Sequence, residues 1–541
     1  MSATAFSLKE WIFTTDHKRV GVLYLIGSLA AFLLAGIMAM LMRAELTTVG
    51  PTVTTNPNAY NVWLYFHGAA MILGYQIPAL TGFFANYYVP LMIGAKDVAF
   101  PRVNALSVWL YWMGIVLALL TFVIPDPPDI MWTGYPPYSS EFSPGNTSFY
   151  TFVVLLIGFS SIAGGINFIT TIIKMRAPGI TWNNLNIFIW SILAAFTLQI
   201  IFVPVLGVAV TLLSFDKYLG TNFFKAAAGG SSLIYENLFW FYSHPAVYVI
   251  LLPAVGIIYE IVATFTRNRI FNYKMVVYGG FWGTVLLSGV VWAHHIYVSG
   301  MPNWIVILQV FTSLLISVPV GLLMVGLLGT LYKGAIEFRT PMLYASGFLF
   351  LFLIGGLTGI PNAMSGIYQQ IHGTYWITGH FHYVMALSVT SAIIGGVYYI
   401  FPKLTGKMYK ESLGKLSFIL FIIGVNVTFF PWFIMGINGM PRRYYDYQQF
   451  PQFEGLQQLS TAGAVIIALS MLVVLIAWLH GLIAGEKSSD NPWGSKSLEW
   501  THTVSPPPPG NFSEIPKLTA DWSPYNYGRK QEEGKKIDEE L

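Results

Sequence analysis

The sequence contains no cysteine and few charged residues, and each shortage excludes a class of protein. Without cysteine among its 541 residues, the chain has no disulfides, no cysteine-ligated iron–sulfur or copper centre, and no haem attached through a Cys-x-x-Cys-His motif. Any metal must therefore be bound by histidine, carboxylate or methionine. Charged residues make up 10% and hydrophobic residues 55% of the chain, whereas soluble domains carry about 25% charged residues. This composition indicates an integral membrane protein, and a formal net charge of only +4 does not indicate nucleic-acid binding.

Long apolar segments define the organisation of the chain. A helix needs about 20 apolar residues to cross a bilayer, and we predict an all-α membrane protein with twelve transmembrane helices within residues 20–485. A polar segment, 1–19, precedes this domain, and we expect no removable signal peptide in it. A polar tail, 486–541, follows the domain. The predicted spans are 20–42, 60–92, 104–125, 147–172, 184–213, 233–265, 275–300, 304–332, 342–363, 374–401, 415–438 and 460–485.

Lysine and arginine are distributed unevenly between the loops. Sixteen lie in the N-terminal segment and one alternating set of loops, and five lie in the other set. Because basic loops stay on the inner side, we predict that both termini are cytoplasmic and that the chain is a multi-pass protein of the bacterial plasma membrane. The tail, which contains four consecutive prolines at 506–509, is predicted to be partly extended or disordered.

Six histidines lie in four of the predicted spans, and the directions of those spans place all six in the outer half of the membrane. A histidine in lipid-embedded sequence is costly unless it is paired or binds something. We therefore expect the six to form one connected site. They are His67, His244, His294, His295, His380 and His382.

The spacing of these histidines predicts how the site is divided. His380 and His382 point about 200° apart on a helix, so they must serve two different centres. One of them can pair with His67 to give an iron with two axial histidines, and the other leaves a haem with a free face. The other three histidines form a three-nitrogen site, which suits copper. An open haem beside copper can bind and reduce a small diatomic molecule, and a closed haem nearby can supply electrons.

Three motifs carry a resemblance to a known family. They are Trp292-Ala-His-His295, His380-Phe-His382 followed by Tyr383, and Met440-Pro-Arg-Arg-Tyr444. With them, the chain resembles subunit I of the haem–copper oxygen reductases, the cytochrome c oxidase family, from about residue 14 to residue 500. The resemblance implies the catalytic subunit of a respiratory terminal oxidase that reduces O2 to water, with electrons from cytochrome c and coupled proton translocation.

The resemblance also implies how two a-type haems are bound. His67 and His382 would be the axial ligands of the low-spin haem, and His380 would be the proximal ligand of the high-spin haem that binds oxygen. Arg43, which follows the first span, matches the position that contacts a substituent of the low-spin haem.

The copper ion, copper B, would be held by His244, His294 and His295. Tyr248 is four residues after His244, so both lie on one face of a helix. In the family these two residues are covalently joined, and the tyrosine supplies an electron and a proton when the O–O bond breaks. Trp240 resembles the residue between the haems and the electron-entry copper of subunit II.

Other implied contacts lie on the outer side. Arg442 and Arg443 resemble the pair that binds haem propionates, a role that bidentate arginine–carboxylate contacts suit. His372 resembles a ligand of a magnesium site shared with subunit II, but the aspartate that follows it in the family is Gly373 here. The implied partners are subunit II, bearing copper A or a cytochrome c domain, subunit III and membrane lipid.

A proton route from the inner side should start at a carboxylate. Asp97 matches the mouth of the family's D-type pathway, and the glutamate that usually ends this route is Ala246. Tyr242 and Ser243 resemble the branch in which a Tyr-Ser pair replaces that glutamate, and two hydroxyls can pass a proton through ordered water. The polar lining of the route matches Asn86, Asn104, Ser160, Ser161 and Asn167.

The family's second, lysine-containing route is missing from this sequence. The threonine and lysine of the family pattern are replaced in Val318-Pro-Val-Gly-Leu-Leu323, so Leu323 stands where the lysine would be. Tyr259 and Glu260 could begin a substitute path. The loss of the lysine favours nitric oxide reduction as an alternative function, while the His244–Tyr248 pair favours oxygen. A twelve-helix transporter without redox chemistry is a third hypothesis, and the histidine pattern argues against it.

Overall fold

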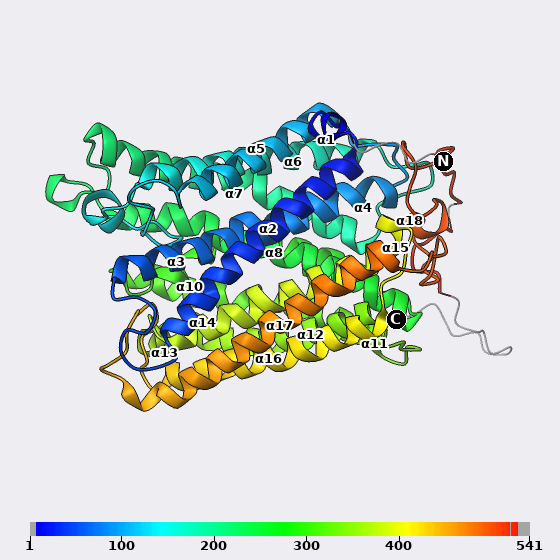
Figure 1. The fold of residues 1–541 in the computed structure, drawn as a ribbon. Helices are drawn as coiled ribbons and strands as arrows, with labels where there is room; N and C mark the ends of the chain where they lie inside the picture. Colours follow the sequence, from blue (N-terminus) through cyan, green and yellow to red (C-terminus); the bar gives the residue numbers. More distant parts are fainter. Residues whose placement is uncertain (1–6, 520, 528–541) are drawn as a thin grey trace.

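Residues 7–519 and 521–527 are described in a computed structural model of the chain. Within these residues every regular element is a helix, accompanied by two isolated β-bridges. The long helices run side by side in one elongated bundle (Figure 1). The predicted all-α class is therefore confirmed, while parts of both predicted terminal segments, 1–6 and 528–541, lie outside the described residues.

Eleven helical stretches in the described part of the chain are long and apolar enough to cross a membrane. They correspond to eleven of the twelve predicted spans, and some of them join several helical elements end to end. In chain order they are α2 (His17–Glu45), α3 to α4 (Pro57–Met92), α5 (Pro101–Leu120), α6 (Thr147–Lys174), α7 (Ile187–Leu219), α8 (Ser232–Thr266), α10 with α11 (Asn303–Leu331), α12 (Thr340–Ala363), α14 to α15 (Tyr375–Thr405), α16 (Glu411–Ile437) and α17 with the turn before it (Pro451–Ala484).

The predicted span at 275–300 does not form one long helix. Its elements are a π-helical segment (Met275–Trp282), α9 (Gly283–Ser288) and a 3-10 helix (Trp292–Ile296). The first helical part ends before Gly289, which lies so close to Phe202 of α7 that an added Cβ would be 2.8 Å from the ring. Five glycines within 275–300 also lower its helix propensity. The break places His294 and His295 in a tight turn rather than on a continuous helix.

The most enclosed stretches of the bundle are the ones that carry candidate ligands. In the most apolar part of α8, 94% of the residues are buried inside the protein. The corresponding share is 83% in the α14–α15 stretch, but only 28% in α2 and in α17. The approach of α8 to α7 is close, because a Cβ on Gly256 would lie 2.2 Å from the hydroxyl of Ser191. Polar side chains on α8 are therefore held in the core of the bundle rather than at its lipid-facing surface.

Three π-helical segments interrupt the stretches that carry His67 and His382. They are Ala70–Gln76, Pro78–Phe84 and His382–Leu387. A π-helical turn adds a residue to the helix, shifts the side chains that follow, and is frequent at functional sites. The π-segment that begins at His382 follows α14 (Tyr375–Phe381) directly, so the helix changes geometry at the ligand itself.

The chain after α17 folds back over the ends of the helices. It includes the short helix α18 (Leu498–Thr501), and Trp500 and Tyr525 are only 1% and 5% exposed. The ammonium group of Lys403, at the end of α15, donates to three backbone carbonyls of this segment. Figure 1 shows the segment, in orange and red, at the end of the bundle where α2 begins. The described part of the predicted tail is thus largely irregular, but it is packed against the bundle.

Candidate metal centre and proton route

Three histidines from two elements converge in the core of the bundle. One possible ligand atom from each of His244, His294 and His295 lies within 4.8 Å of the others. Nδ1 of His244 is 3.0 Å from Nε2 of His295, and His244 is only 5% exposed. Imidazole nitrogens crowded together away from water suit a transition-metal ion such as copper. The remaining nitrogen Nδ1 of His294 is 2.8 Å from the hydroxyl oxygen of Ser313, a contact that fixes the ring orientation.

Tyr248 lies one turn along α8 from His244, as its spacing indicated. Its hydroxyl oxygen is 3.0 Å from Nε2 of His244, and the two ring centroids are 5.0 Å apart. The phenol therefore reaches the edge of the histidine cluster with its only polar atom.

His67 and His382 face each other across a gap. Their ring centroids are 6.3 Å apart and the ring planes differ by only 12°. Nδ1 of His67 is 3.0 Å from the carbonyl of Ala35, and Nδ1 of His382 is 2.8 Å from the carbonyl of Thr378. These contacts leave each Nε2 free to bind a metal. The separation leaves room for one ion with metal–imidazole bonds of about 2 Å on each side.

His380 is held in the same manner on another wall of the site. Its Nδ1 is 2.9 Å from the carbonyl of Gly355 in α12. The ring also packs on Gly359, where an added Cβ would be 2.9 Å from Cε1 of His380. The glycine is therefore part of the seat that positions this imidazole.

All six histidines line one large cavity of about 1540 Å³, which exceeds the roughly 300–1,000 Å³ of a drug-sized pocket. Most of its walls are apolar side chains, and Arg442 and Arg443 line it as well. A cavity of this size with histidine nitrogens on its walls fits two large, flat, metal-containing cofactors.

The two adjacent arginines place concentrated positive charge at this cavity. Burial and the neighbouring Arg442 lower the pKa of Arg443 to about 9. Arg443 also has a left-handed backbone, with φ of 70°, which is uncommon outside glycine. None of the four ion pairs found among the described residues involves either arginine. An anionic group on a bound cofactor would provide the missing partner.

Arg43 and Trp240 occupy two further walls of the cavity. Arg43 is 6% exposed and donates through Nη2 to the carbonyl and the side chain of Gln457 and to Thr461, but its buried Nε has no hydrogen-bond partner. Trp240 stacks on His295, with centroids 3.7 Å apart and planes within 8°, and its indole N–H donates to the hydroxyl of Tyr135.

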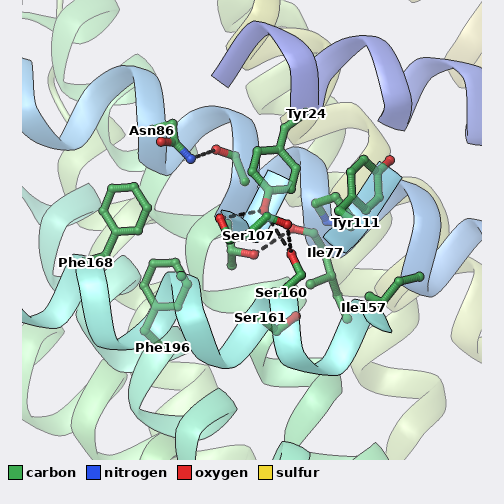
Figure 2. A pocket seen from close by; sticks show the side chains of 14 residues that line it. Tyr24, Ile77, Asn86, Ser107, Tyr111, Ile157, Ser160, Ser161, Phe168 and Phe196 are labelled. Atoms are coloured by element: carbon green, nitrogen blue, oxygen red, sulfur yellow. Dashed lines mark hydrogen bonds between the residues drawn. The ribbon is translucent and has the colours of Figure 1, made fainter. Parts of the chain in front are cut away.

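Three of the eight predicted proton-route residues line a second, small cavity between α2, the α3 to α4 stretch, α5 and α6 (Figure 2). Its volume of about 20 Å³ exceeds the roughly 10–15 Å³ that one water needs. Two hydroxyls not predicted from the sequence, those of Tyr24 and Ser107, complete it: the Tyr24 oxygen is 3.0 Å from both Ser107 and Ser160. The predicted residues that line it are Asn86, Ser160 and Ser161.

The two remaining asparagines lie toward Asp97. Asn104 donates to the side chain of Asn86 at 2.6 Å, and Asn167 accepts from the backbone N–H of Phe100 at 2.8 Å. Burial raises the pKa of the Asp97 carboxyl to about 6. Asn104 is thus hydrogen-bonded to a residue of the small cavity, and Asn167 is hydrogen-bonded to the loop that follows Asp97.

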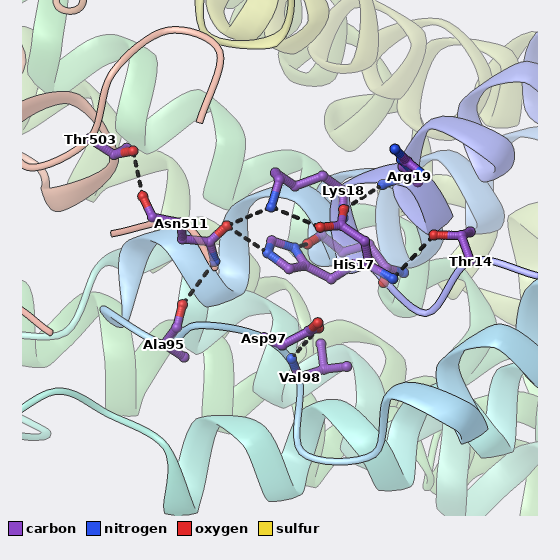
Figure 3. A network of polar contacts seen from close by, with 11 residues as sticks. Thr14, His17, Lys18, Arg19, Ala95, Asp97, Val98, Thr503 and Asn511 are labelled. Carbon is purple, nitrogen blue, oxygen red and sulfur yellow. Dashed lines mark hydrogen bonds and ion pairs between the residues drawn. The ribbon is translucent and has the colours of Figure 1, made fainter. Parts of the chain in front are cut away.

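A polar network that includes the C-terminal segment surrounds the loop of Asp97 (Figure 3). Nδ1 of His17 is 2.6 Å from the carbonyl of Asn86, and Nε2 is 2.9 Å from the side-chain oxygen of Asn511. Asn511 also donates to the carbonyl of Ala95 at 2.8 Å. Asn511 was not singled out from the sequence, because a lone asparagine in an irregular tail has no pattern.

Tyr242 and Ser243, which are predicted to end the proton route, both line the large cavity. Ser243 is 2% exposed and its hydroxyl has no hydrogen-bond partner. A buried hydroxyl without a partner beside a cavity is a natural binding position for an ordered water.

Leu323 lies in a densely packed part of the bundle. It is 0% exposed, and a Cβ on Gly280 would be 2.5 Å from its side chain. The hydroxyl of Tyr259 donates to the carbonyl of Leu323 at 2.6 Å. An apolar, closely packed side chain thus stands where the family has a lysine, and the hydroxyl of Tyr259 is hydrogen-bonded to a backbone carbonyl.

His372 is not part of a metal-binding cluster within the described residues, where the only such group is the three-histidine site. Its Nδ1 is 2.7 Å from the hydroxyl of Tyr368, whose oxygen donates to the carbonyl of His295 at 3.1 Å. Burial and the charges of the two arginines lower the pKa of His372 to about 4.

Fold and site together define a membrane-spanning helical bundle built around a buried histidine cluster. A family model described as cytochrome c and quinol oxidase polypeptide I matches residues 19–466. The chain is 41% identical over 527 residues to cytochrome c oxidase subunit 1 of Thermostichus vulcanus, covering 96% of this chain and 93% of that one. It is 42% identical over 516 residues to the Synechocystis sp. protein of the same name, covering 95% and 92%.

Two further similarities extend this result. A heme-copper oxidase subunit I+III from Aeropyrum pernix is 41% identical over 515 residues, covering 95% of this chain and 62% of that one. A solved heme-copper terminal oxidase dimer has the same fold, with a TM-score of 0.76 at 19% identity over 87% of this chain and 85% of that one. The chain belongs to the cytochrome c and quinol oxidase polypeptide I family. It is the catalytic subunit of an oxygen-reducing terminal oxidase.

Proposed function

We propose that the six histidines hold two haems and one copper ion, at which the protein reduces O2 to water with electrons from cytochrome c. The observation that carries the proposal is the convergence of three imidazoles within 4.8 Å, with the Tyr248 hydroxyl 3.0 Å from one of them. His380 lies on the wall of the same cavity. When bound, these cofactors supply electron transfer and oxygen binding.

The contacts of the haem ligands support their assignment. His67 and His382 would hold the low-spin haem from its two faces, because their parallel rings each keep Nδ1 on a backbone carbonyl. His380 would hold the second haem from one face only. Its Nδ1 contact with Gly355 fixes the ring so that Nε2 is the ligand atom.

Arginine side chains would bind the haem edges. Arg442 and Arg443 fit propionate groups, because two guanidinium groups lining one cavity need anions. The unpartnered Nε of Arg43 fits a polar substituent on the low-spin haem, as an a-type haem would present.

Tyr248 would supply an electron and a proton to oxygen through its position beside His244. Protons would reach the centre from Asp97 through the asparagines and the small cavity, and then through Tyr242 and Ser243, with coupled translocation across the membrane. A hydroxyl both donates and accepts a hydrogen bond, so the Tyr-Ser pair can pass a proton without ionising.

The remaining assignments concern the assembly. We take the broken stretch Met275–Ile296 as the twelfth span, with both termini on the cytoplasmic side of the bacterial plasma membrane. Subunit II would bring electrons to Trp240, and subunit III would pack on the bundle, as the fused subunit I+III relative supports. A magnesium site shared with subunit II would use His372, without the aspartate that Gly373 replaces.

Steady-state turnover of the purified complex with reduced cytochrome c tests the proposal, with oxygen and nitric oxide electrodes run in parallel. We expect rapid oxygen uptake with little loss of nitric oxide. Rapid anaerobic loss of nitric oxide with negligible oxygen uptake would overturn the proposal. The relatives named as cytochrome c oxidases do not favour that alternative.

A further inference from the structure

A buried carboxyl group, Glu260, lies at the opposite end of α8 from the histidine cluster. It follows His244 by sixteen residues, or about 24 Å along a helix, and it is 5% exposed. Its Oε1 accepts hydrogen bonds from the backbone N–H of Phe188 at 3.1 Å and from the hydroxyl of Tyr525 at 2.6 Å. Its Oε2 accepts from the side chain of Asn186 at 3.1 Å. None of the four ion pairs among the described residues includes this carboxyl.

The hydroxyl of Tyr525 connects Glu260 to the C-terminal segment. It accepts from the backbone N–H of Ile187 at 2.7 Å, so its own proton is directed at the Glu260 carboxyl. Because this hydroxyl covers the carboxyl from the side of the C-terminal segment, a proton that reaches Glu260 from that side must pass it.

A second buried carboxyl, Glu499 of α18, lies within electrostatic range of Glu260. It is 0% exposed, Oε1 accepts from Ser497 at 2.5 Å, and Oε2 has no partner. Burial and the charge of Glu260 raise the pKa of Glu499 to about 8. The nearby ammonium of Lys403 does not pair with it, because Lys403 donates to backbone carbonyls of the C-terminal segment.

Hydroxyl groups lead from Glu499 into the bundle. The oxygens of Ser497 and Ser495 are 3.0 Å apart, and Ser495 accepts from Tyr527 at 3.5 Å. Thr264 of α8 is 3.2 Å from the Tyr527 oxygen and 3.0 Å from that of Tyr399 in α15. Each of these groups both donates and accepts, so the succession can carry a proton inward.

A further buried hydroxyl, that of Tyr88, has no hydrogen-bond partner and lies within electrostatic range of both carboxyls and of Tyr399. An unsatisfied hydroxyl at this depth marks a place for an ordered water. The titratable groups that face the two carboxyls are Tyr88, Tyr273, Tyr399, Lys403, Tyr525 and Tyr527.

We propose that Glu260 and Glu499 form a second proton-loading site, which takes up protons from the inner aqueous phase under the control of the C-terminal segment. In this step a hydronium ion gives up one proton, and the proton forms an O–H bond with a carboxylate oxygen. No electron is transferred. The C-terminal segment supplies Glu499, Tyr525 and Tyr527, so its displacement would open the site. The proposal rests on the proposed function in one respect: the protons taken up at this site are consumed when O2 is reduced to water.

Reduced-minus-oxidised infrared difference spectra of the purified complex test this directly. We expect a carboxyl C=O band that shifts in D2O, disappears in Glu260→Gln and is altered in Glu499→Gln. Tyr525→Phe removes only the covering hydroxyl and should shift the band. The matched control is Glu411→Gln, because Glu411 accepts from the Thr340 N–H at 2.7 Å but has no contact with the hydroxyl succession, and this variant should retain the band.

Turnover provides the second readout. Glu260→Gln should slow oxygen uptake by on the order of tenfold without changing the optical spectrum, and Glu411→Gln should not. An unchanged band and unchanged turnover in Glu260→Gln and Tyr525→Phe would overturn the proposal. If wild-type protein consumes oxygen in those same experiments, the proposed function stands while the loading site fails. If wild-type protein consumes no oxygen, the proposed function itself fails.

Discussion

A methyl group added at Gly359 of α12 would meet the imidazole of His380. The added Cβ would lie 2.9 Å from Cε1 and 3.6 Å from Nε2 of that ring, closer than ordinary contact allows. The ring cannot move freely, because its Nδ1 contacts the carbonyl of Gly355 at 2.9 Å. The substitution Gly359→Ala should therefore displace the proposed proximal ligand of the oxygen-binding haem.

The magnitude follows from two opposing effects. Overpacking a tight contact costs about 1–3 kcal/mol. Part of this cost is offset because alanine is about 0.5–1 kcal/mol more favourable than glycine inside a helix. The net loss is about 0–2.5 kcal/mol, and the middle of that range corresponds to roughly tenfold weaker axial binding at His380, since about 1.4 kcal/mol is a factor of ten.

The assay is the carbon monoxide difference spectrum of the reduced protein, which reports the haem with an open face. We expect a reduced carbon monoxide signal in Gly359→Ala, while the low-spin haem on His67 and His382 keeps its spectrum. The control is Gly356→Ala in the same helix, where an added Cβ has no atom within 4 Å. A normal signal in Gly359→Ala, or an equal loss in Gly356→Ala, would refute the reasoning.

Three further expectations follow from the proton groups. Because burial raises the pKa of Asp97 to about 6, its carboxylate is ionised above that pH; the turnover ratio of wild type to Asp97→Asn should be large at pH 8 and approach one as the pH falls below 6. Tyr24→Phe removes the hydroxyl that bridges Ser107 and Ser160, so proton uptake measured with a pH indicator should slow while haem content stays normal; uptake at the wild-type rate would remove Tyr24 from the route. Tyr248→Phe should lower oxygen turnover by on the order of 10²-fold or more with normal metal content, and a fully active variant would contradict the role of this phenol.

The sequence was sufficient for the fold class, because apolar length and loop charge are local properties of the chain. The break before Gly289 could not be predicted, since it depends on how closely Phe202 of α7 approaches. For this reason eleven of the twelve predicted spans are long continuous helical stretches among the described residues, and the count of twelve stays a prediction. The helix α9 is only six residues long (Gly283–Ser288), and the two histidines that follow it lie in a 3-10 turn.

The candidate site was predictable where a residue type is rare in the surrounding sequence. Histidines stand out in apolar sequence, and all six line the same cavity. Tyr24 and Ser107 did not stand out, because single hydroxyls occur throughout apolar helices and only packing shows which of them meet. Asn511 and Tyr525 were missed for a different reason: the tail was expected to be partly extended or disordered, and its contacts with His17 and Glu260 depend on how it folds back.

The most direct test of the account is the metal content of the purified chain with its partner subunits. Beyond the metals that subunit II brings, elemental and pigment analysis should give two haem irons and one copper per copy of this subunit, and His294→Ala should lose that one copper while keeping both haems. Copper bound at the full level in His294→Ala, or a single haem in the wild-type protein, would contradict the assignment of the six histidines.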